Sequence, residues 1–443
     1  MGGVWLSLTA SELGRRIGAG RINPVELAEA YLEAGRLHPL QERIFARTTP
    51  ARARSEAMAA HARAKTGNRL GLLDGVPISW KDLFDSANVA TESGSALLAG
   101  RVPTSDAEVL RNATAAGLVC LGKTHMSELA FSGLGLNPVT ATPPCINDAG
   151  AVAGGSSSGA AASVAFGLAP AAIGSDTFGS VRIPAAWNDL VGLKTTTGRL
   201  SVSGVVPLCP RFDTVGPLTR SVEDAAQLLA LLQGIRPADL RGATLSGTRL
   251  MVLDTVATDA LRDAPARGFE LAVDRLAQAG AQISHRAVPE VAEALSLVGL
   301  LSAAEAYGLW RDTIEADPGK MFARILERFR GGADFTAADY VAGWHRLDRL
   351  RAVWSAAVAD FDAVILPTSP ILPPAAERLM TDPTYYVQEN LLALRNTRIG
   401  SLLGLCGLTL PTGVPSVGIS FLGAPNGEER LLRLGTAAEA ALR

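Results

Sequence analysis

Residues 154–184, GGSSSGAAASVAFGLAPAAIGSDTFGSVRIP, hold two glycine-flanked serine clusters on either side of an alanine-rich segment. The alanine-rich run 160–167 favours a helix, and the apolar run 171–174 favours a buried strand. Glycine permits sharp turns and close approach to a ligand, and serine hydroxyls can carry protons or act as nucleophiles. The stretch therefore predicts a helix–strand unit with a serine-bearing turn at each end, and a site that uses both turns.

Strand and helix patterns alternate along the rest of the chain. No low-complexity linker and no internal repeat interrupts them. This alternation predicts an α/β fold: one α/β/α body with a mixed central sheet covered by helices on both faces. We expect a single domain over residues 1–443, made of peripheral N-terminal helices at 9–65, a core at 71–225 and a variable helical region at 290–360.

Composition limits the class of protein and its partners. The chain has 443 residues with 48% hydrophobic and 19% charged residues, which favours a large core over disorder. A formal net charge of −2 without a lysine- or arginine-dense run argues against nucleic acid or an anionic membrane as partner. We see no secretion signal and no apolar run able to span a bilayer. We expect a soluble cytoplasmic protein, either a monomer or a homodimer.

Metal and nucleotide sites have little support in the sequence. The four cysteines are scattered without a CxxC pair, and the five histidines show no HExxH or similar spacing. Residues 122–124, GKT, lack the upstream glycine of a phosphate loop. We therefore expect no disulfide and no metal site.

Two lysines are placed where burial would make them unusual. Lys81 follows the short apolar strand 78–80, and a lysine at the end of a buried strand is costly unless it is paired or neutral. Asp82 and Asp85 could pair it at a surface edge, or it could be functional, and the sequence alone leaves both readings open. Lys194, in GLKT, is the second candidate for a buried lysine.

A histidine-dependent serine hydrolase is one reading of the serine cluster. Residues 155–159 fit the G-x-S-x-G pattern with Ser157 at the centre. That motif needs a preceding strand, and residues 139–153 resemble a loop instead. It also needs a histidine, and neither His285 nor His345 lies at an obvious strand end. We disfavour this reading.

A lysine-dependent mechanism is the alternative. A neutral lysine can accept a proton, provided that a relay joins it to the nucleophile. Between Ser156 and Ser180 there is room for one helix, one strand and a return turn, so both hydroxyls can reach one edge of the sheet. The backbone N–H groups of the second turn could stabilise an oxyanion. The turn comprises Thr177, Phe178, Gly179 and Ser180.

Several long motifs together resemble those of the amidase signature family, and the resemblance covers nearly the whole chain. The serine block is the most specific of them. They are GVPISWKD (75–82), DAEVLRNATAAGLVCLGKTHMSELA (106–130), GGSSSGAAA (154–162), GSDTFGSVRIPAAW (174–187), GLKTTTGRLS (192–201), GPLTRSVEDAA (216–226) and GLTLPTGVPSVGISFLG (407–423).

The resemblance implies roles for particular residues. Ser180 would be the acyl-accepting nucleophile, Ser156 a relay held by a non-proline cis peptide bond, and Lys81 the general base. Lys194 would then be structural. Ala130 and Ser132, in the loop before the glycine pair, would border the substrate. The reaction would pass through an acyl-enzyme intermediate and need no metal or organic cofactor.

One departure from the family pattern concerns the DTGGS block, which reads DTFGS here. Phe178 stands where glycine usually lets substrate approach. Its side chain either points away, leaving only its N–H group in the site, or shapes an aromatic-lined acyl pocket. We favour the former reading and keep Phe178 among the candidate substrate-binding residues.

The expected substrate is a small molecule with an amide or carbamate bond. The sequence shows no charged specificity signal, which favours aryl or alkyl amides, anilides or carbamates, with urethanase-like activity and esterase activity on the side. The alternative within the family is a glutaminase-like subunit of a tRNA-dependent amidotransferase. A catalytically inactive binding protein is a third reading, and the presence of Lys81, Ser156 and Ser180 speaks against it.

Overall fold

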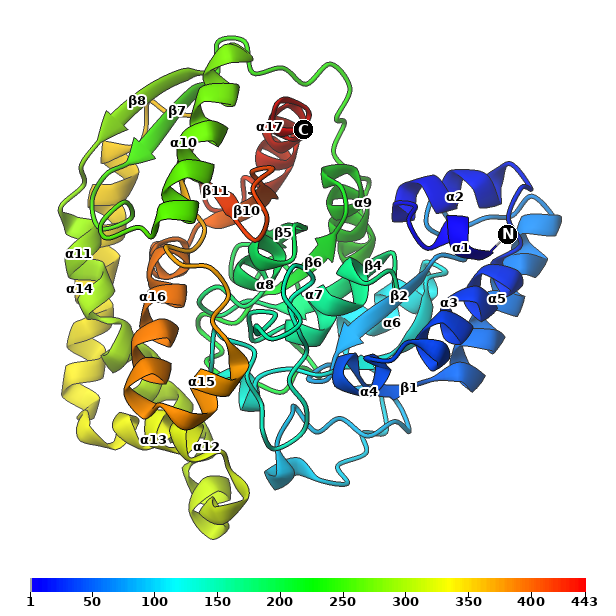
Figure 1. Cartoon of the computed structure of the whole chain (residues 1–443), viewed down its shortest axis with the longest axis horizontal. Helices are drawn as coiled ribbons and strands as arrows, with labels where there is room; N and C mark the ends of the chain where they lie inside the picture. The colour runs from blue at the N-terminus through cyan, green and yellow to red at the C-terminus, as the bar shows by residue number, and fades with distance from the viewer. Residues whose placement is uncertain (1) are drawn as a thin grey trace.

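The computed structural model describes residues 2–443 and arranges them around one sheet of 11 strands (Figure 1). In order across the sheet the strands are β1 (Phe45–Thr48), β3 (Val119–Thr124), β2 (Pro77–Lys81), β4 (Ala171–Ser175), β6 (Val215–Thr219), β5 (Val191–Lys194), β10 (Cys406–Pro411), β11 (Gly418–Gly423), β9 (Ala363–Pro367), β7 (Arg249–Leu253) and β8 (Gln282–Arg286). Strand β2 pairs in parallel with β3 and β4, and β7 with β8 and β9, whereas the central pairs are antiparallel. The predicted mixed α/β sheet is confirmed.

Helices cover both faces of this sheet. Between residues 2 and 233 the helices are α1 (Gly2–Trp5), α2 (Ala10–Gly18), α3 (Pro24–Leu37), α4 (Gln41–Ile44), α5 (Pro50–Lys65), α6 (Glu108–Ala115), α7 (Ser158–Ala165), α8 (Arg182–Trp187) and α9 (Val222–Gln233). The later helices are α10 (Asp263–Gln278), α11 (Glu290–Ser296), α12 (Ala304–Ala316), α13 (Ala323–Arg330), α14 (Ala337–Ala357), α15 (Ala376–Thr381), α16 (Pro383–Leu402) and α17 (Glu428–Leu442).

Strand β10 shows how the two helical layers are separated. Successive strand residues point to opposite faces. A Cβ on Gly435 of α17 would lie 2.1 Å from Leu408, whereas a Cβ on Gly407 would lie 3.4 Å from Arg182 of α8. Helix α17 therefore covers one face of β10 and α8 the other, and α9 packs beside α17 (Figure 1).

The N-terminal region contributes more than the peripheral helices that the sequence predicts. Phe45–Thr48 forms β1 and pairs antiparallel with β3, which adds an edge strand to the sheet. The segment FART is too short and too polar to show the alternation that marks a strand. At the opposite end of the sheet, β8 is largely exposed, unlike the fully buried central strands.

The expectation that no apolar run could span a bilayer is wrong for one helical stretch. Glu290–Ala316, which joins α11 to α12 through the π-helical turn Gly299–Ala303, is long and apolar enough to cross a membrane by length and composition. The core helices of soluble proteins pass the same test, and 39% of its most apolar window is buried inside the protein. Its first part packs against α14 and α16.

Candidate active site

Lys81, the last residue of β2, is fully buried and faces the serine-bearing turns. Its Nζ donates hydrogen bonds to the hydroxyl of Ser156 at 2.7 Å and to that of Ser175 at 2.8 Å. Ser175 is the last residue of β4, which lies beside β2 in the sheet. The pairing of these two strands thus brings the amine to the start of both turns.

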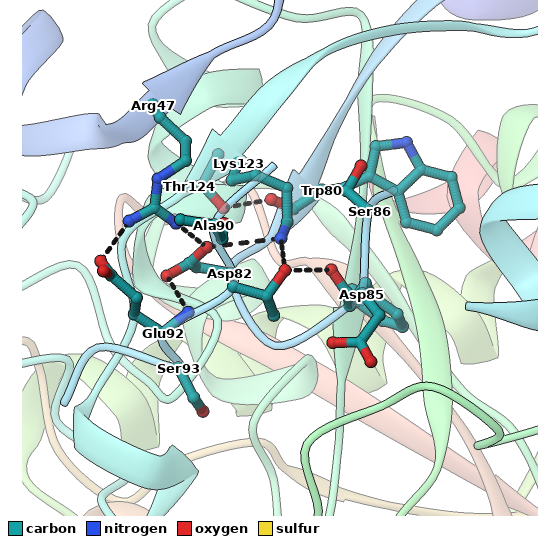
Figure 2. Close-up of polar contacts among 12 residues, drawn as sticks. Arg47, Trp80, Asp82, Asp85, Ser86, Ala90, Glu92, Ser93, Lys123 and Thr124 are labelled. Atoms are coloured by element: carbon teal, nitrogen blue, oxygen red, sulfur yellow. Dashed lines mark hydrogen bonds and ion pairs between the residues drawn. The ribbon is translucent and has the colours of Figure 1, made fainter. Parts of the chain in front are cut away.

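The two aspartates that come after Lys81, Asp82 and Asp85, pair with other cations, and Figure 2 shows Asp82 with Arg47 and Lys123. The Asp82 carboxylate lies 2.5 Å from Arg47 and 3.4 Å from the buried Lys123. Asp85 binds Arg101 at 2.6 Å. The reading of Lys81 as one half of a surface ion pair is therefore wrong, because other cations engage both carboxylates.

Burial without a carboxylate partner changes the acidity of the Lys81 amine. Desolvation disfavours the charged form and lowers the pKa of Lys81 to about 7, although the charges of Asp176 and Asp213 partly oppose this shift. A substantial fraction of the amine is therefore neutral at neutral pH and able to accept a proton.

The first turn holds Ser156 in a defined orientation. The Gly155–Ser156 peptide bond is cis, as the family resemblance implies. Gly155 donates its N–H to the carbonyl of Gly133 at 2.8 Å, and Ser127 donates to the carbonyl of Ser156 at 3.1 Å. A Cβ on Gly155 would lie 2.6 Å from the backbone nitrogen of Gly135, so only glycine fits this close approach.

The second turn is organised by the buried carboxylate of Asp176. Arg182 pairs with it at 2.9 Å, and both side chains are fully buried. Burial alone would raise the pKa of Asp176, but the guanidinium lowers it to about 2. The same carboxylate accepts the N–H of Gly179 at 2.7 Å and that of Val181 at 3.1 Å.

This arrangement corrects the predicted set of oxyanion donors. The N–H of Gly179 is directed at Asp176 and is not available to a substrate. The N–H groups of Thr177, Phe178 and Ser180 make no hydrogen bond within residues 2–443. Three of the four predicted donors therefore remain for a developing negative charge.

The two turns lie against each other through their backbones. Ser157 donates its N–H to the carbonyl of Ser180 at 3.1 Å. In the described part of the chain no hydrogen bond joins the hydroxyls of Ser156 and Ser180. Catalytic hydrogen bonds are often long without substrate. The structure thus connects Lys81 to Ser156 directly and places Ser180 on the adjoining turn.

Ser157 has a different environment from Ser156. Its hydroxyl donates to the carbonyl of Ser175 at 3.1 Å, and the residue precedes α7 with no exposed surface. No histidine contacts it in the part of the chain that the structure describes. The G-x-S-x-G reading therefore lacks both its strand and its base.

A narrow chamber of about 20 Å³ opens beside Ser180. Three predicted substrate-binding residues, Ala130, Ser132 and Phe178, line it together with Ser180. The Phe178 ring packs on Phe212 with ring centroids 4.9 Å apart. Phe178 thus borders the chamber, while its ring packs against a residue that does not line the chamber.

A larger outer chamber of about 480 Å³ shares several wall residues with the narrow one. They are Phe131, Val298, Ser302, Arg328 and Arg398. Val298 and Ser302 lie at the π-helical turn between α11 and α12, and such turns are common at functional sites. The apolar stretch 290–316 thus supplies part of the pocket wall.

Two residues of the site were missed from the sequence. Ser175, which binds Lys81, lies inside a quoted motif without an assigned role, and its contact with Lys81 follows from the pairing of β2 with β4. Asp176 stood inside the quoted motif without an assigned role. Lys194 donates to the carbonyls of Thr195 and Leu405 at 2.9 and 3.0 Å, which suits a structural role.

The fold is a mixed α/β sheet, and at the candidate site a buried amine bonds to two serine hydroxyls. The family model described as Amidase matches residues 26–432. The chain therefore belongs to the amidase signature family, whose enzymes hydrolyse C–N bonds of small-molecule amides and can be oligomers.

Individual relatives agree with this assignment. The chain is 37% identical to 2-amino-5-chloromuconic acid deaminase from Comamonas testosteroni, over 88% of this chain and 86% of that protein. It is 32% identical to a glutamyl-tRNA(Gln) amidotransferase subunit from Anaeromyxobacter dehalogenans (strain 2CP-C), over 97% and 95% of the two chains.

Solved structures show the same architecture. A chain from a vestigial protein complex, described as revealing the origins of an s-triazine catabolic enzyme, has a TM-score of 0.90 and 27% identity and covers 98% of each chain. A crystal structure described as an amidase has a TM-score of 0.88 and 29% identity, with 98% of this chain and 100% of that chain covered.

The ionisation of Lys81 predicts the pH dependence of activity. Its neutral form is the one that accepts a proton, and this form increases as pH rises through a pKa of about 7. We expect kcat/KM to rise from pH 5 to pH 8 with a midpoint near neutrality. Lys81→Ala should lower kcat about a hundredfold or more. A flat profile, or an active Lys81→Ala enzyme, would contradict this role.

The backbone conformation of Gly179 predicts that a larger residue at this position lowers activity. Its φ is +137°, and a Cβ there would lie 2.2 Å from the Thr397 hydroxyl. Gly179→Ala should shift the turn that carries Ser180 and lower kcat about a hundredfold while the fold persists. Gly308→Ala in α12, where a Cβ meets nothing within 4 Å, is the control. Equal kcat values for both folded variants would show that the turn tolerates displacement.

Proposed function

We propose that the protein hydrolyses the C–N bond of a small-molecule amide through an acyl-enzyme on Ser180. The observation that carries the proposal is the buried Lys81 amine, which has no carboxylate partner and lies 2.7 Å from Ser156. A lysine that is neutral near pH 7 and bonded to a serine hydroxyl is suited to take a proton through that hydroxyl.

The chemical steps follow from this arrangement. Lys81 accepts the proton of the Ser156 hydroxyl as Ser156 takes the proton of Ser180. The Ser180 oxygen then bonds to the substrate carbonyl carbon, and the N–H groups of Thr177, Phe178 and Ser180 stabilise the resulting oxyanion. The C–N bond breaks as Ser156 donates a proton to the leaving nitrogen. The protonated Lys81 amine then donates a proton to Ser156. The same relay then takes a proton from water, whose oxygen bonds to the acyl carbon. The ester bond to Ser180 breaks, the relay returns the proton to the Ser180 oxygen, and the acyl group leaves as a carboxylic acid.

The bond classes that we propose are aryl or alkyl amides, anilides and carbamates, with urethanase-like and esterase activities. The chamber beside Ser180 supports an acyl group of modest size, because Phe178 and Leu208 line it. The relative named as a deaminase of 2-amino-5-chloromuconic acid adds that unsaturated amino acid to the compounds to be tested.

A second candidate is a glutaminase-like subunit of a tRNA-dependent amidotransferase. Similarity to several proteins named as glutamyl-tRNA(Gln) amidotransferase subunits, at 30–32% identity, supports it. Such a protein would release ammonia from glutamine and act within an assembly. Strong hydrolysis of simple amides or anilides by the chain alone, without activity on glutamine, would favour the first candidate.

Trapping the intermediate tests the proposed nucleophile. Rapid mixing of the enzyme with a p-nitroanilide should release a burst of p-nitroaniline equal to the active sites, and mass spectrometry should find the acyl group on Ser180. Ser180→Ala should abolish the burst and lower kcat at least about a thousandfold. Ser157→Ala, one position from the proposed relay, should stay within about tenfold of the unaltered enzyme. Acylation of Ser157, or turnover by folded Ser180→Ala, would refute the assignment.

A further inference from the structure

Two arginines from separate helices reach the pocket beside Ser180. Arg328 lies in α13 and Arg398 in α16. Both line the narrow chamber that contains Ser180 and also the outer chamber. They therefore stand where the two chambers meet, next to the proposed reaction centre.

Both guanidinium groups have donors without a partner. Nη1 of Arg328 and Nε of Arg398 are enclosed and make no hydrogen bond to any of the described residues. Within residues 2–443 no carboxylate lies within 4.0 Å of either side chain. The only acidic residue in the lining of the two chambers is Glu327, whose side chain is exposed. The Arg328 guanidinium instead lies over the Phe131 ring, 4.4 Å from its centroid.

The fully buried arginine of this protein, by contrast, has a carboxylate partner. Arg182 is fully buried and pairs with Asp176 through two nitrogens. An enclosed charge without a partner is costly, and two adjacent like charges add to that cost. Burial and the charge of Arg328 lower the pKa of Arg398 to about 9, which still leaves it protonated at neutral pH. The wall shared by the two chambers therefore carries two positive charges without a carboxylate partner among residues 2–443, and Arg324, which lines the outer chamber alone, adds a third.

We propose that Arg328 and Arg398 form a carboxylate-binding site, so that the substrate carries a carboxylate a short distance from its scissile carbonyl. The guanidinium group presents paired donors that match the two oxygens of a carboxylate. The chamber between the arginines and Ser180 is only about 20 Å³, which favours a short spacer. This inference rests on the proposed function of Ser180, and it narrows the proposed small-molecule amides to monoamides of short dicarboxylic acids.

Binding without turnover tests the arginine site separately from catalysis. Calorimetry on the full chain at constant ionic strength should detect binding of succinate or glutarate and much weaker binding of butyramide. Arg398→Gln and Arg328→Gln should each weaken dicarboxylate binding about tenfold or more. Arg398→Lys, which keeps the charge, should weaken it less. Arg21→Gln, at an exposed arginine, is the matched control and should bind as the unaltered chain does.

Turnover by the unaltered enzyme gives a second measurement that needs no variant. Ammonia release should show kcat/KM at least about tenfold higher for succinamate or glutaramate than for butyramide or pentanamide. Dicarboxylates that bind no better than butyramide, affinity unchanged in both glutamine variants, or binding of inorganic phosphate but not of dicarboxylates would overturn the proposal. Arginine-dependent dicarboxylate binding in an enzyme that cleaves no amide would support this site and count against the proposed function instead.

Discussion

The buried amine of Lys81 is the feature on which the rest of the site depends. It sits at the end of an interior strand, hydrogen-bonded to two serine hydroxyls and to no carboxylate. The carboxylate of its neighbour Asp82 is engaged by Arg47 and Lys123 (Figure 2). The network of ion pairs around Asp82 thus leaves Lys81 with a lowered pKa and a capacity to accept protons.

Buried charges in this protein fall into two groups. Those of Asp176 with Arg182, and of Asp82 with Lys123, are paired and organise the backbone around the site. Those of Arg328 and Arg398 are half-buried at the pocket wall, and one enclosed donor on each has no hydrogen-bond partner among residues 2–443. Because an enclosed donor without a partner destabilises a fold, we infer that a ligand supplies the partner at this pocket.

Sequence patterns predicted much of the fold and part of the site, for identifiable reasons. The central strands are buried on both faces, so β4 and β9 appear as continuous apolar runs, and the serine turns carry a long motif. The edge strand β1 has no such run. Ser175 and Asp176 acquire their contacts only from strand pairing and turn geometry. Arg328 lies in a strongly amphipathic helix, and the arginines of such a helix are usually on its solvent-exposed face. The sequence therefore did not predict that this arginine lines a pocket.

Direct titration of the Lys81 amine tests the central claim most sharply. The Nζ chemical shift can be followed by NMR in protein labelled with ¹⁵N-lysine, and Lys81→Met identifies the resonance. The account predicts a transition near pH 7 for this one amine, with the fold intact across the range. A transition near the ordinary lysine value of 10.5 would show that the buried amine stays charged at neutral pH, and would contradict its role as the base.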